Sequence, residues 1–175
     1  MIFSEMDHRL SIIKRWSIVH TIQQQSVAEH AFNVERIAIR IARDWFEFTN
    51  PSVLFEISQY ALHHDDFEAV SGDTPSTVKR YFDVGRAELE HADIIPVVPK
   101  PASHLMNIVK LADRLEWYWF LTMESALGNK YIEDYRLELY GIIHQFATEH
   151  YATHTEKILG AMRGMKPMLR DYKWR

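Results

Sequence analysis

Two histidines and two aspartates interrupt apolar helical patterns in this chain: His30, the adjacent pair His64-Asp65, and Asp113. Apolar residues lie at helical spacings from each of them, so each is expected on or beside a buried helix face. A buried lone carboxylate is unfavourable unless it is paired or bound to a metal. Imidazole and carboxylate together suit a divalent transition metal ion. The four residues are therefore candidate ligands of one ion.

The same spacing allows a second interpretation without a metal. Asp65 and Asp113 would then be buried members of ion pairs, with Arg114 or Lys110 as the partner. A single buried histidine would be an ordinary core residue. Spacing alone leaves both interpretations open.

Other histidines are weaker candidates for metal binding. His150 and His154 have the four-residue spacing of ligands on one helix face, but charged neighbours such as Glu149 indicate a solvated surface. His91 and His104 lie between Asp65 and Asp113 in sequence, and we do not expect them to hold a second ion.

Composition limits the chemistry further. The 175 residues include ten His and no Cys, which excludes disulfides, iron–sulfur clusters and thiol catalysis. A net charge of -4 argues against binding of polymeric nucleic acid. No apolar run long enough for a membrane span occurs, and the charged N-terminal stretch does not resemble a signal peptide. Phosphate-binding loops, dinucleotide-binding glycine motifs, serine-hydrolase elbows and zincin motifs are also absent.

These side chains need a scaffold, and the apolar periodicity predicts helices. We expect an all-α fold, a single domain over residues 1–175 with five to seven helices. A capping box formed by Ser26 and Glu29 should start the helix that carries His30. The predicted helices or helical stripes cover residues 5–14, 27–45, 53–64, 84–94, 105–119 and 131–158.

Breakers separate these helices. Asn50-Pro51 interrupts the chain, residues 71–76 read as a loop, and prolines at 96, 99 and 101 impose an extended crossing. Gly128-Asn129 is expected to end the helix that carries Asp113.

The candidate ligands and their surroundings resemble a known family. The order His30, His64-Asp65, Asp113 is that of HD-domain metal-dependent phosphohydrolases. The sequence segments that flank these residues resemble the YfbR-like 5′-deoxynucleotidases over about Arg15 to Glu124. Ala28 and Ser76 depart from the family pattern without removing a chemical group that the site needs. The matching segments are Arg15-Trp16-Ser17-Ile18, Ser26-Val27-Ala28-Glu29-His30, His64-Asp65-Asp66-Phe67-Glu68-Ala69, Gly72-Asp73-Thr74-Pro75, Val78-Lys79-Arg80-Tyr81-Phe82 and Val109-Lys110-Leu111-Ala112-Asp113.

The resemblance implies an all-helical enzyme that cleaves the 5′ phosphoester of 2′-deoxynucleotides. One catalytic ion (Zn, Co or Mn) would be held by His30, His64, Asp65 and Asp113, and Mg could accompany a triphosphate. Glu68 would act in catalysis from the helix face that carries His64, four residues earlier.

The resemblance also implies roles for residues outside the ligand set. Asp73 matches the second catalytic carboxylate. Arg15, Lys79 and Lys110 match phosphate-binding bases, and Trp16 matches a residue that packs near the sugar and disfavours a ribose 2′-hydroxyl.

A viral subset of the family hydrolyses dATP to deoxyadenosine and triphosphate. Trp16, Ile18 and Pro75 resemble its adenine pocket, where Ile18 would fill the space beside adenine C2. We therefore expect dATP as the substrate. The alternatives are a deoxynucleoside 5′-monophosphatase and a non-catalytic helical interaction protein that uses the basic segment Arg163 to Arg175.

The same resemblance implies a cellular location, partners and an oligomeric state. The location is cytoplasmic (the host cytoplasm for a phage protein), without membrane or polymeric nucleic-acid partners, and with assembly into a homo-oligomer, a dimer or a hexamer.

Overall fold

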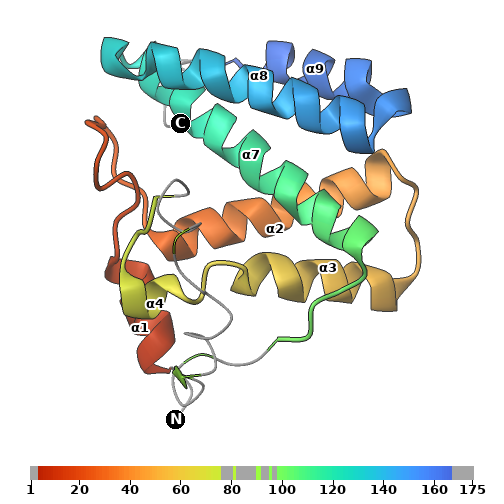
Figure 1. The fold of residues 1–175 in the computed structure, drawn as a ribbon, viewed down its shortest axis with the longest axis horizontal. Coiled ribbons are helices and arrows are strands. Elements are labelled where there is room, and N and C mark those ends of the chain that lie inside the picture. Colours follow the sequence, from red (N-terminus) through yellow and green to blue (C-terminus); the bar gives the residue numbers. More distant parts are fainter. Residues whose placement is uncertain (1–3, 76–80, 82–89, 92–94, 96–97, 167–175) are drawn as a thin grey trace, which may run out of the picture.

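The computed structural model describes residues 4–75, 81, 90–91, 95 and 98–166. Within these ranges the chain is helical, and its one β-type contact is the isolated bridge between Lys14 and Ser26 (Figure 1). The predicted all-α class is confirmed. The elements are α1 (Glu5–Ile12), α2 (Val27–Asp44), α3 (Pro51–His63), α4 (Glu68–Ser71), α7 (Ser103–Ala126), η1 (Lys130–Ile132), α8 (Glu133–His150), η2 (Ala152–His154) and α9 (Thr155–Gly164).

Helix α2 begins where the capping box predicts. The Ser26 side chain accepts a hydrogen bond from the Glu29 backbone, and the Glu29 carboxylate accepts one from Ser26 N at 2.7 Å. His30 lies one turn later, on the same buried face as Val34 and Ala38. The cap therefore sets the register that turns His30 into the interior.

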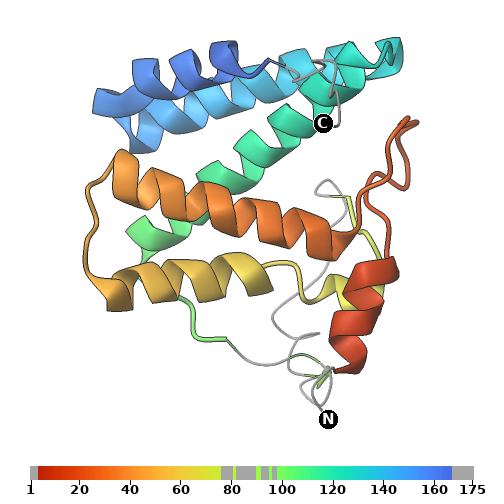
Figure 2. The same ribbon diagram turned by 180° about the vertical axis from the view of Figure 1, so that it is seen from behind.

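Helices α2, α3 and α7 enclose the core. Helix α2 packs against both α3 and α7, and α7 crosses the pair at an angle (Figure 1). Ile57, Ile108, Leu111 and Leu115 fill the space between them and are nearly inaccessible to solvent. Helices α8 and α9 pack together over the C-terminal half of α7 (Figure 2).

The predicted helix over residues 131–158 is wrong in its continuity. Tyr151 leaves the helical region with φ -142° and ψ 46°, and α9 starts afresh at Thr155. The break is stabilised by tertiary contacts: His154 Nε2 lies 3.2 Å from the Trp45 carbonyl oxygen, and the Tyr151 ring packs 4.9 Å from that of Phe46. Packing against the end of α2 overrides the local helical pattern.

Other predicted helix boundaries agree more closely with the structure. Helix α1 ends at Ile12, two residues before the predicted end. Helix α7 stops just before Gly128, which takes a left-handed φ of 95° and so provides the expected stop. The helix predicted over residues 84–94 falls largely outside the described residues. No helix of the described chain combines the length and apolarity needed to cross a bilayer. The single-domain boundary at residues 1–175 stays a prediction.

Candidate metal centre and cavity

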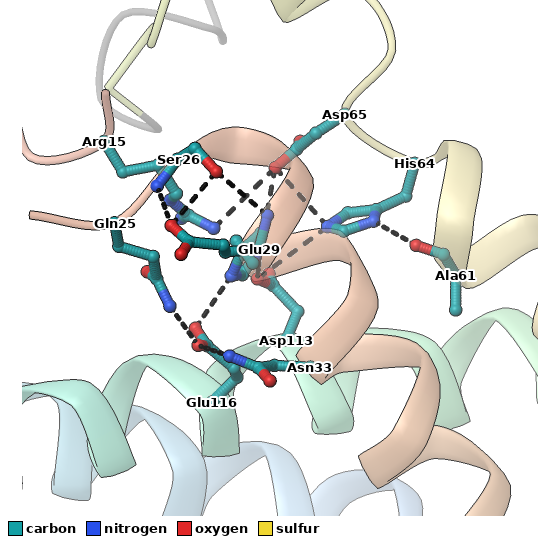
Figure 3. A network of polar contacts seen from close by, with 11 residues as sticks. Arg15, Gln25, Ser26, Glu29, Asn33, Ala61, His64, Asp65, Asp113 and Glu116 are labelled. Atoms are coloured by element: carbon teal, nitrogen blue, oxygen red, sulfur yellow. Dashed lines mark hydrogen bonds and ion pairs between the residues drawn. The ribbon is translucent and has the colours of Figure 1, made fainter. Parts of the chain in front are cut away.

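The four candidate ligands converge at one point: His64, Asp65 and Asp113 lie together in Figure 3, and the ion-pair distances place His30 beside them. His30 comes from α2, His64 and Asp65 from the end of α3, and Asp113 from α7. His30 Nε2 lies 3.1 Å from Asp113 Oδ1 and 3.6 Å from Asp65 Oδ2. His64 Nε2 lies 3.4 Å from Asp65 Oδ2 and 4.0 Å from Asp113 Oδ1. Residues that are 83 positions apart in sequence, His30 and Asp113, are thus in contact.

This spacing fits a metal ion. Nitrogen and oxygen ligands about 2.0–2.2 Å from a common ion lie roughly 3–4 Å from one another. His30 Nε2, His64 Nε2 and Asp113 Oδ1 are buried and make no well-formed hydrogen bond among the described residues. Buried polar atoms are normally satisfied, so three unsatisfied atoms facing one point suit a cation.

The opposite nitrogen of each imidazole is already engaged. His64 Nδ1 lies 2.7 Å from the Ala61 carbonyl oxygen, which can only accept, so Nδ1 must donate. His30 Nδ1 lies 2.7 Å from Glu116 Oε2. In neutral rings both bonds leave the Nε2 lone pair directed at the cluster, as metal binding requires.

Glu116 is a site residue that the sequence analysis missed. It is fully buried on α7 and also accepts hydrogen bonds from Gln25 Nε2 at 2.6 Å and Asn33 Nδ2 at 3.3 Å. The signal was available, because Glu116 follows Asp113 by three residues and therefore shares its helix face.

The electrostatics of the cluster favour positive charge. Burial and the nearby Arg15 lower the pKa of His30, but the close carboxylates of Asp113 and Glu116 outweigh them and raise it overall. Burial raises the pKa of Asp113, yet the close contact with His30 and its charge lower this pKa below its usual range. The carboxylates that raise the pKa of His30 would also stabilise a divalent cation.

The residues predicted as ion-pair partners of Asp65 and Asp113 have other surroundings in the structure. The Arg114 guanidinium lies over the Phe146 ring, 4.3 Å from its centroid, and donates to the Lys110 carbonyl oxygen at 2.8 Å. The Lys110 side chain is exposed. Among the described ion pairs, Asp65 and Asp113 face the two imidazoles, and Asp65 also faces Arg15 at 4.0 Å. Neither predicted partner, Arg114 or Lys110, forms a described ion pair with Asp65 or Asp113. Burial lowers the pKa of Arg114 overall, although the charge of Asp113 acts to raise it.

A cavity of about 360 Å³ opens beside the cluster. Two candidate ligands, Asp65 and Asp113, lie on its wall. The other predicted site residues on its wall are Arg15, Trp16, Ile18, Glu68, Asp73 and Pro75.

Glu68 reaches the cavity by a different route from the one predicted. Helix α3 ends at His63, and Glu68 begins the separate short helix α4 after a turn. Its side chain is nevertheless only 2% exposed and lines the cavity. The turn therefore brings the carboxylate there without a continuous helix face.

The loop from Arg15 to Gln25 forms one wall, and the Lys14–Ser26 bridge closes it. Arg15 is buried, with its guanidinium 5.4 Å from the centre of the Trp117 ring. Trp16 has a left-handed φ of 66° and stacks on Phe120 with ring centroids 5.3 Å apart. A non-glycine residue adopts this conformation only when its surroundings hold it there.

Asp73 has a structural partner. Its Oδ2 accepts a hydrogen bond from Ser17 N at 3.0 Å, immediately after Trp16. The predicted catalytic carboxylate thus also ties the loop after α4 to the Trp16 segment.

The remaining predicted substrate-binding residues lie at the edge of the cavity or away from it, or outside the described residues. Ile18 lies at the rim and is 74% exposed. Lys110 is exposed and does not line the cavity, although it stands one turn before Asp113. Lys79 lies outside the described residues.

Helix α8 supplies a wall that the sequence analysis did not anticipate. Tyr135, Glu138, Leu139 and Ile142 share one face of this helix and line the cavity. They lie beyond the segment, about Arg15 to Glu124, over which the family resemblance extends. The α8 helical pattern was visible, but its placement over α7 depends on tertiary packing.

The other histidine pair has structural contacts. The His150 ring packs 4.5 Å from that of Phe146, and His154 Nδ1 lies 2.9 Å from Thr153 Oγ1. Across the described residues, the grouping with metal-ligand spacing is His30, His64 and Asp65, with Asp113 beside it.

Comparisons with known protein sequences point to one family. The sequence model of a family described as 5′-deoxynucleotidase YfbR-like matches residues 2–92. A 5′-deoxynucleotidase of Cronobacter sakazakii is 33% identical over 146 residues, covering 69% of this chain and 71% of that protein. The 5′-deoxynucleotidase VP0926 of Vibrio parahaemolyticus is 27% identical over 145 residues, covering 69% and 73%.

Solved structures establish the fold. The HD phosphohydrolase DatZ of cyanophage S-2L, bound to dA and one catalytic Zn²⁺ ion, superposes with a TM-score of 0.71 at 20% identity, covering 94% of this chain and 97% of that one. The PH0347 protein of Pyrococcus horikoshii gives a TM-score of 0.71 at 20% identity, covering 92% and 96%.

Proposed function

Because this chain is an enzyme of the YfbR-like 5′-deoxynucleotidase family of HD-domain phosphohydrolases, we propose that it hydrolyses the 5′ phosphoester of 2′-deoxynucleotides in the cavity beside His30 and Asp65. The observation that carries the proposal is the convergence of buried, unsatisfied Nε2 and Oδ1 atoms in a cluster whose members Asp65 and Asp113 line this cavity. Relatives named 5′-deoxynucleotidases support the reaction class. The alternative of a non-catalytic interaction protein is wrong.

We assign the metal to His30, His64, Asp65 and Asp113. A bound divalent ion would lower the pKa of a water molecule and polarise a phosphoryl oxygen. Glu116 and the Ala61 carbonyl orient the two imidazoles for this role. The zinc described for DatZ supports an ion of this class, and Zn, Co and Mn are the candidates.

Glu68 is the proposed proton carrier. It is buried, lines the cavity, and comes three residues after Asp65. A carboxylate at this position can take a proton from the attacking water and deliver one to the leaving 5′ oxygen. Asp73, which holds Ser17, would assist from the opposite loop.

Arg15 is the proposed phosphate ligand. Its buried guanidinium lies on the cavity wall, and Nη1 has no well-formed hydrogen bond although it faces Asp65 at 4.0 Å. A planar guanidinium can bind two phosphate oxygens at once. Lys79 and Lys110 stay predictions as further point charges, with Lys110 placed outside the cavity wall.

The apolar part of the cavity is suited to a nucleoside. Trp16 would pack against the sugar, while Ile18 and Pro75 would border the base. Apolar side chains of α7 and α8, including Leu121 and Leu139, would complete the slot. The dA bound to DatZ supports adenine, so dATP, cleaved to deoxyadenosine and triphosphate with Mg on the phosphates, is the proposed substrate.

A deoxynucleoside 5′-monophosphatase is the second candidate. It is favoured by the names of the sequence relatives, which are 5′-deoxynucleotidases. The two candidates share the site and differ in the number of phosphates that the open end of the cavity accepts.

Chromatography separates the candidates. The protein is incubated with each dNTP, dNDP, dNMP and ATP in the presence of Zn, Co, Mn or Mg. Deoxyadenosine and triphosphate from dATP would support the first candidate, whereas orthophosphate from dNMPs alone would support the second. No hydrolysis of any nucleotide with any metal would refute both. A cytoplasmic location and a dimeric or hexameric assembly stay predictions.

A further inference from the structure

A second buried glutamate lies on α7, away from the metal cluster. Glu124 is fully buried, eight residues after Glu116. Its Oε2 accepts from Ile22 N at 2.6 Å and from Asn129 Nδ2 at 2.8 Å, and its Oε1 accepts from Gln23 N at 2.7 Å. The carboxylate therefore binds two consecutive backbone amides of the Arg15–Gln25 loop.

The same contacts extend back towards Trp16. Asn129 Nδ2 also donates to the His20 carbonyl oxygen at 2.8 Å. A turn hydrogen bond from Val19 N to the Trp16 carbonyl oxygen, 2.9 Å, spans the intervening residues. A continuous path of hydrogen bonds and short backbone segments thus joins Glu124 to the residue proposed to contact the sugar.

Trp16 needs such support. Its left-handed backbone is held by Ser17 N bonding Asp73 on one side and by the Trp16–Val19 turn on the other. Its ring stacks on Phe120, one turn before Glu124 on α7. Helix α7 therefore holds both the Trp16 ring and, through Glu124, the far half of the loop.

The two buried glutamates of α7 have separate partners. Glu116 binds His30 and Gln25, whereas Glu124 has no described contact with a metal ligand. A buried carboxylate satisfied by loop amides makes loop opening unfavourable, because both the charge and the amides would lose their partners. Glu124 is thus placed to fix the loop without changing the metal centre.

We propose that Glu124 is a positioning residue that sets the discrimination between deoxyribonucleotides and ribonucleotides by holding the Trp16 loop. The proposal rests on the proposed function, in which Trp16 packs against the sugar. The Trp16 ring can exclude the 2′-hydroxyl of a ribonucleotide only if the ring does not move aside. The discrimination between deoxyribose and ribose therefore depends on how firmly the loop is held. A loosened loop would admit the 2′-hydroxyl and would bind the deoxyribose less tightly.

The test is Glu124→Gln, which keeps the size of the side chain. The glutamine side chain has a single carbonyl oxygen, which can replace only one of the two carboxylate oxygens. Its NH2 group must then face the N–H of Ile22 or of Gln23, and two donors cannot form a hydrogen bond. We expect the deoxy-to-ribo ratio of kcat/KM to fall by at least about fivefold, the scale of small pocket changes. KM for the deoxynucleotide should rise more than kcat falls.

Hydrogen–deuterium exchange gives a readout independent of activity. The amides of Ile22 and Gln23 should exchange faster in Glu124→Gln, while the zinc content per chain stays that of the wild type. Glu133→Gln is the matched control, because Glu133 accepts hydrogen bonds from Ser125 and Arg136 and has no described bond to the loop. The control should change neither the ratio nor the exchange of these amides.

The outcomes separate this inference from the proposed function. Loop exchange unchanged in Glu124→Gln, or faster exchange with an unchanged deoxy-to-ribo ratio, would overturn the role of Glu124 in an active enzyme. A wild-type protein that hydrolyses no nucleotide would instead overturn the proposed function on which it rests. If Glu124→Gln does not fold, Asn129→Ala removes one of the three donors and should shift the ratio in the same direction.

Discussion

The Nδ1 atom of His30 lies 2.7 Å from a carboxylate oxygen of Glu116, and both side chains are completely buried. The bond joins α2 to α7 across 86 residues of sequence. It orients the imidazole so that Nε2 faces Asp113, and it places a negative charge behind a candidate metal ligand. Carboxylate–imidazole pairs of this kind raise the basicity of the ligand and fix its orientation.

Substitution of Glu116 should therefore weaken metal binding without removing a ligand. Glu116→Gln can still accept from Nδ1 but loses the charge, so we expect zinc affinity to fall by about 10–100-fold. Competition against a chromophoric chelator measures the affinity. Glu124→Gln, the same substitution two turns along α7, should retain wild-type affinity, and equal losses in the two variants would contradict a specific role for Glu116.

Asp65 lies within 3.6 Å of both imidazole Nε2 atoms, so its removal takes away a proposed ligand. We expect Asp65→Ala to abolish both metal content and turnover, measured by elemental analysis of the dialysed protein and by nucleotide hydrolysis. The neighbouring variant Asp66→Asn is the control, because Asp66 pairs with His63 at 2.6 Å and lies outside the cluster. Retained activity in Asp65→Ala would refute the assigned site.

Metal removal should lower stability, because it leaves buried Nε2 and Oδ1 atoms unsatisfied. An ion at 100 times its dissociation constant stabilises the native state by about 2.7 kcal/mol. We expect the Tm to fall when a chelator is added and to recover with zinc. The Tm of Asp113→Ala should not respond to either addition; a shift of wild-type size in this variant would place the stabilising ion elsewhere.

Trp16→Ala should weaken the exclusion of ribonucleotides, because the ring stacked on Phe120 is the proposed barrier to a 2′-hydroxyl. We expect the rate on ATP to rise relative to that on dATP, measured as the ratio of kcat/KM values. Phe120→Leu, which removes only the stacking partner, should give a smaller change in the same direction. An unchanged ratio in Trp16→Ala would show that another residue contacts the sugar.

Ile18→Ala should relax discrimination against dGTP by roughly 1–3 kcal/mol if this side chain fills the space beside adenine C2. Because Ile18 stands 74% exposed at the cavity rim, we expect a value near the lower end of that range. The ratio of kcat/KM for dATP and dGTP measures it. Ile12→Ala, a similarly exposed isoleucine outside the cavity wall, is the control, and a loss of discrimination there would point to a general effect on stability.

Much of this protein follows from local patterns. The Ser26–Glu29 cap, the periodicity of α2 and α7, and the stop at Gly128 were readable because each depends on neighbours within one or two helical turns. The convergence of the four candidate ligands was predictable for a related reason. Ionisable residues on apolar faces must find partners in the interior, whichever elements supply them.

The errors have a common origin in contacts between distant segments. The break at Tyr151 depends on packing against Trp45 and Phe46, more than 100 residues earlier. Arg114, one of the predicted ion-pair partners, places its guanidinium over the Phe146 ring of α8 and forms no described ion pair with Asp65 or Asp113. No local pattern contains such information.

By itself the sequence determined most of the helices, the four ionisable residues that meet in the cluster, and the family. Tertiary structure alone decided that Glu116 supports His30, that Glu124 holds the Trp16 loop, and that α8 closes the cavity. The physical reason is that periodicity reports which face of a helix is buried, whereas the partner on that face depends on how the helices cross. A buried carboxylate is thus foreseeable as a requirement for a partner, and its partner becomes known only once the fold is assembled.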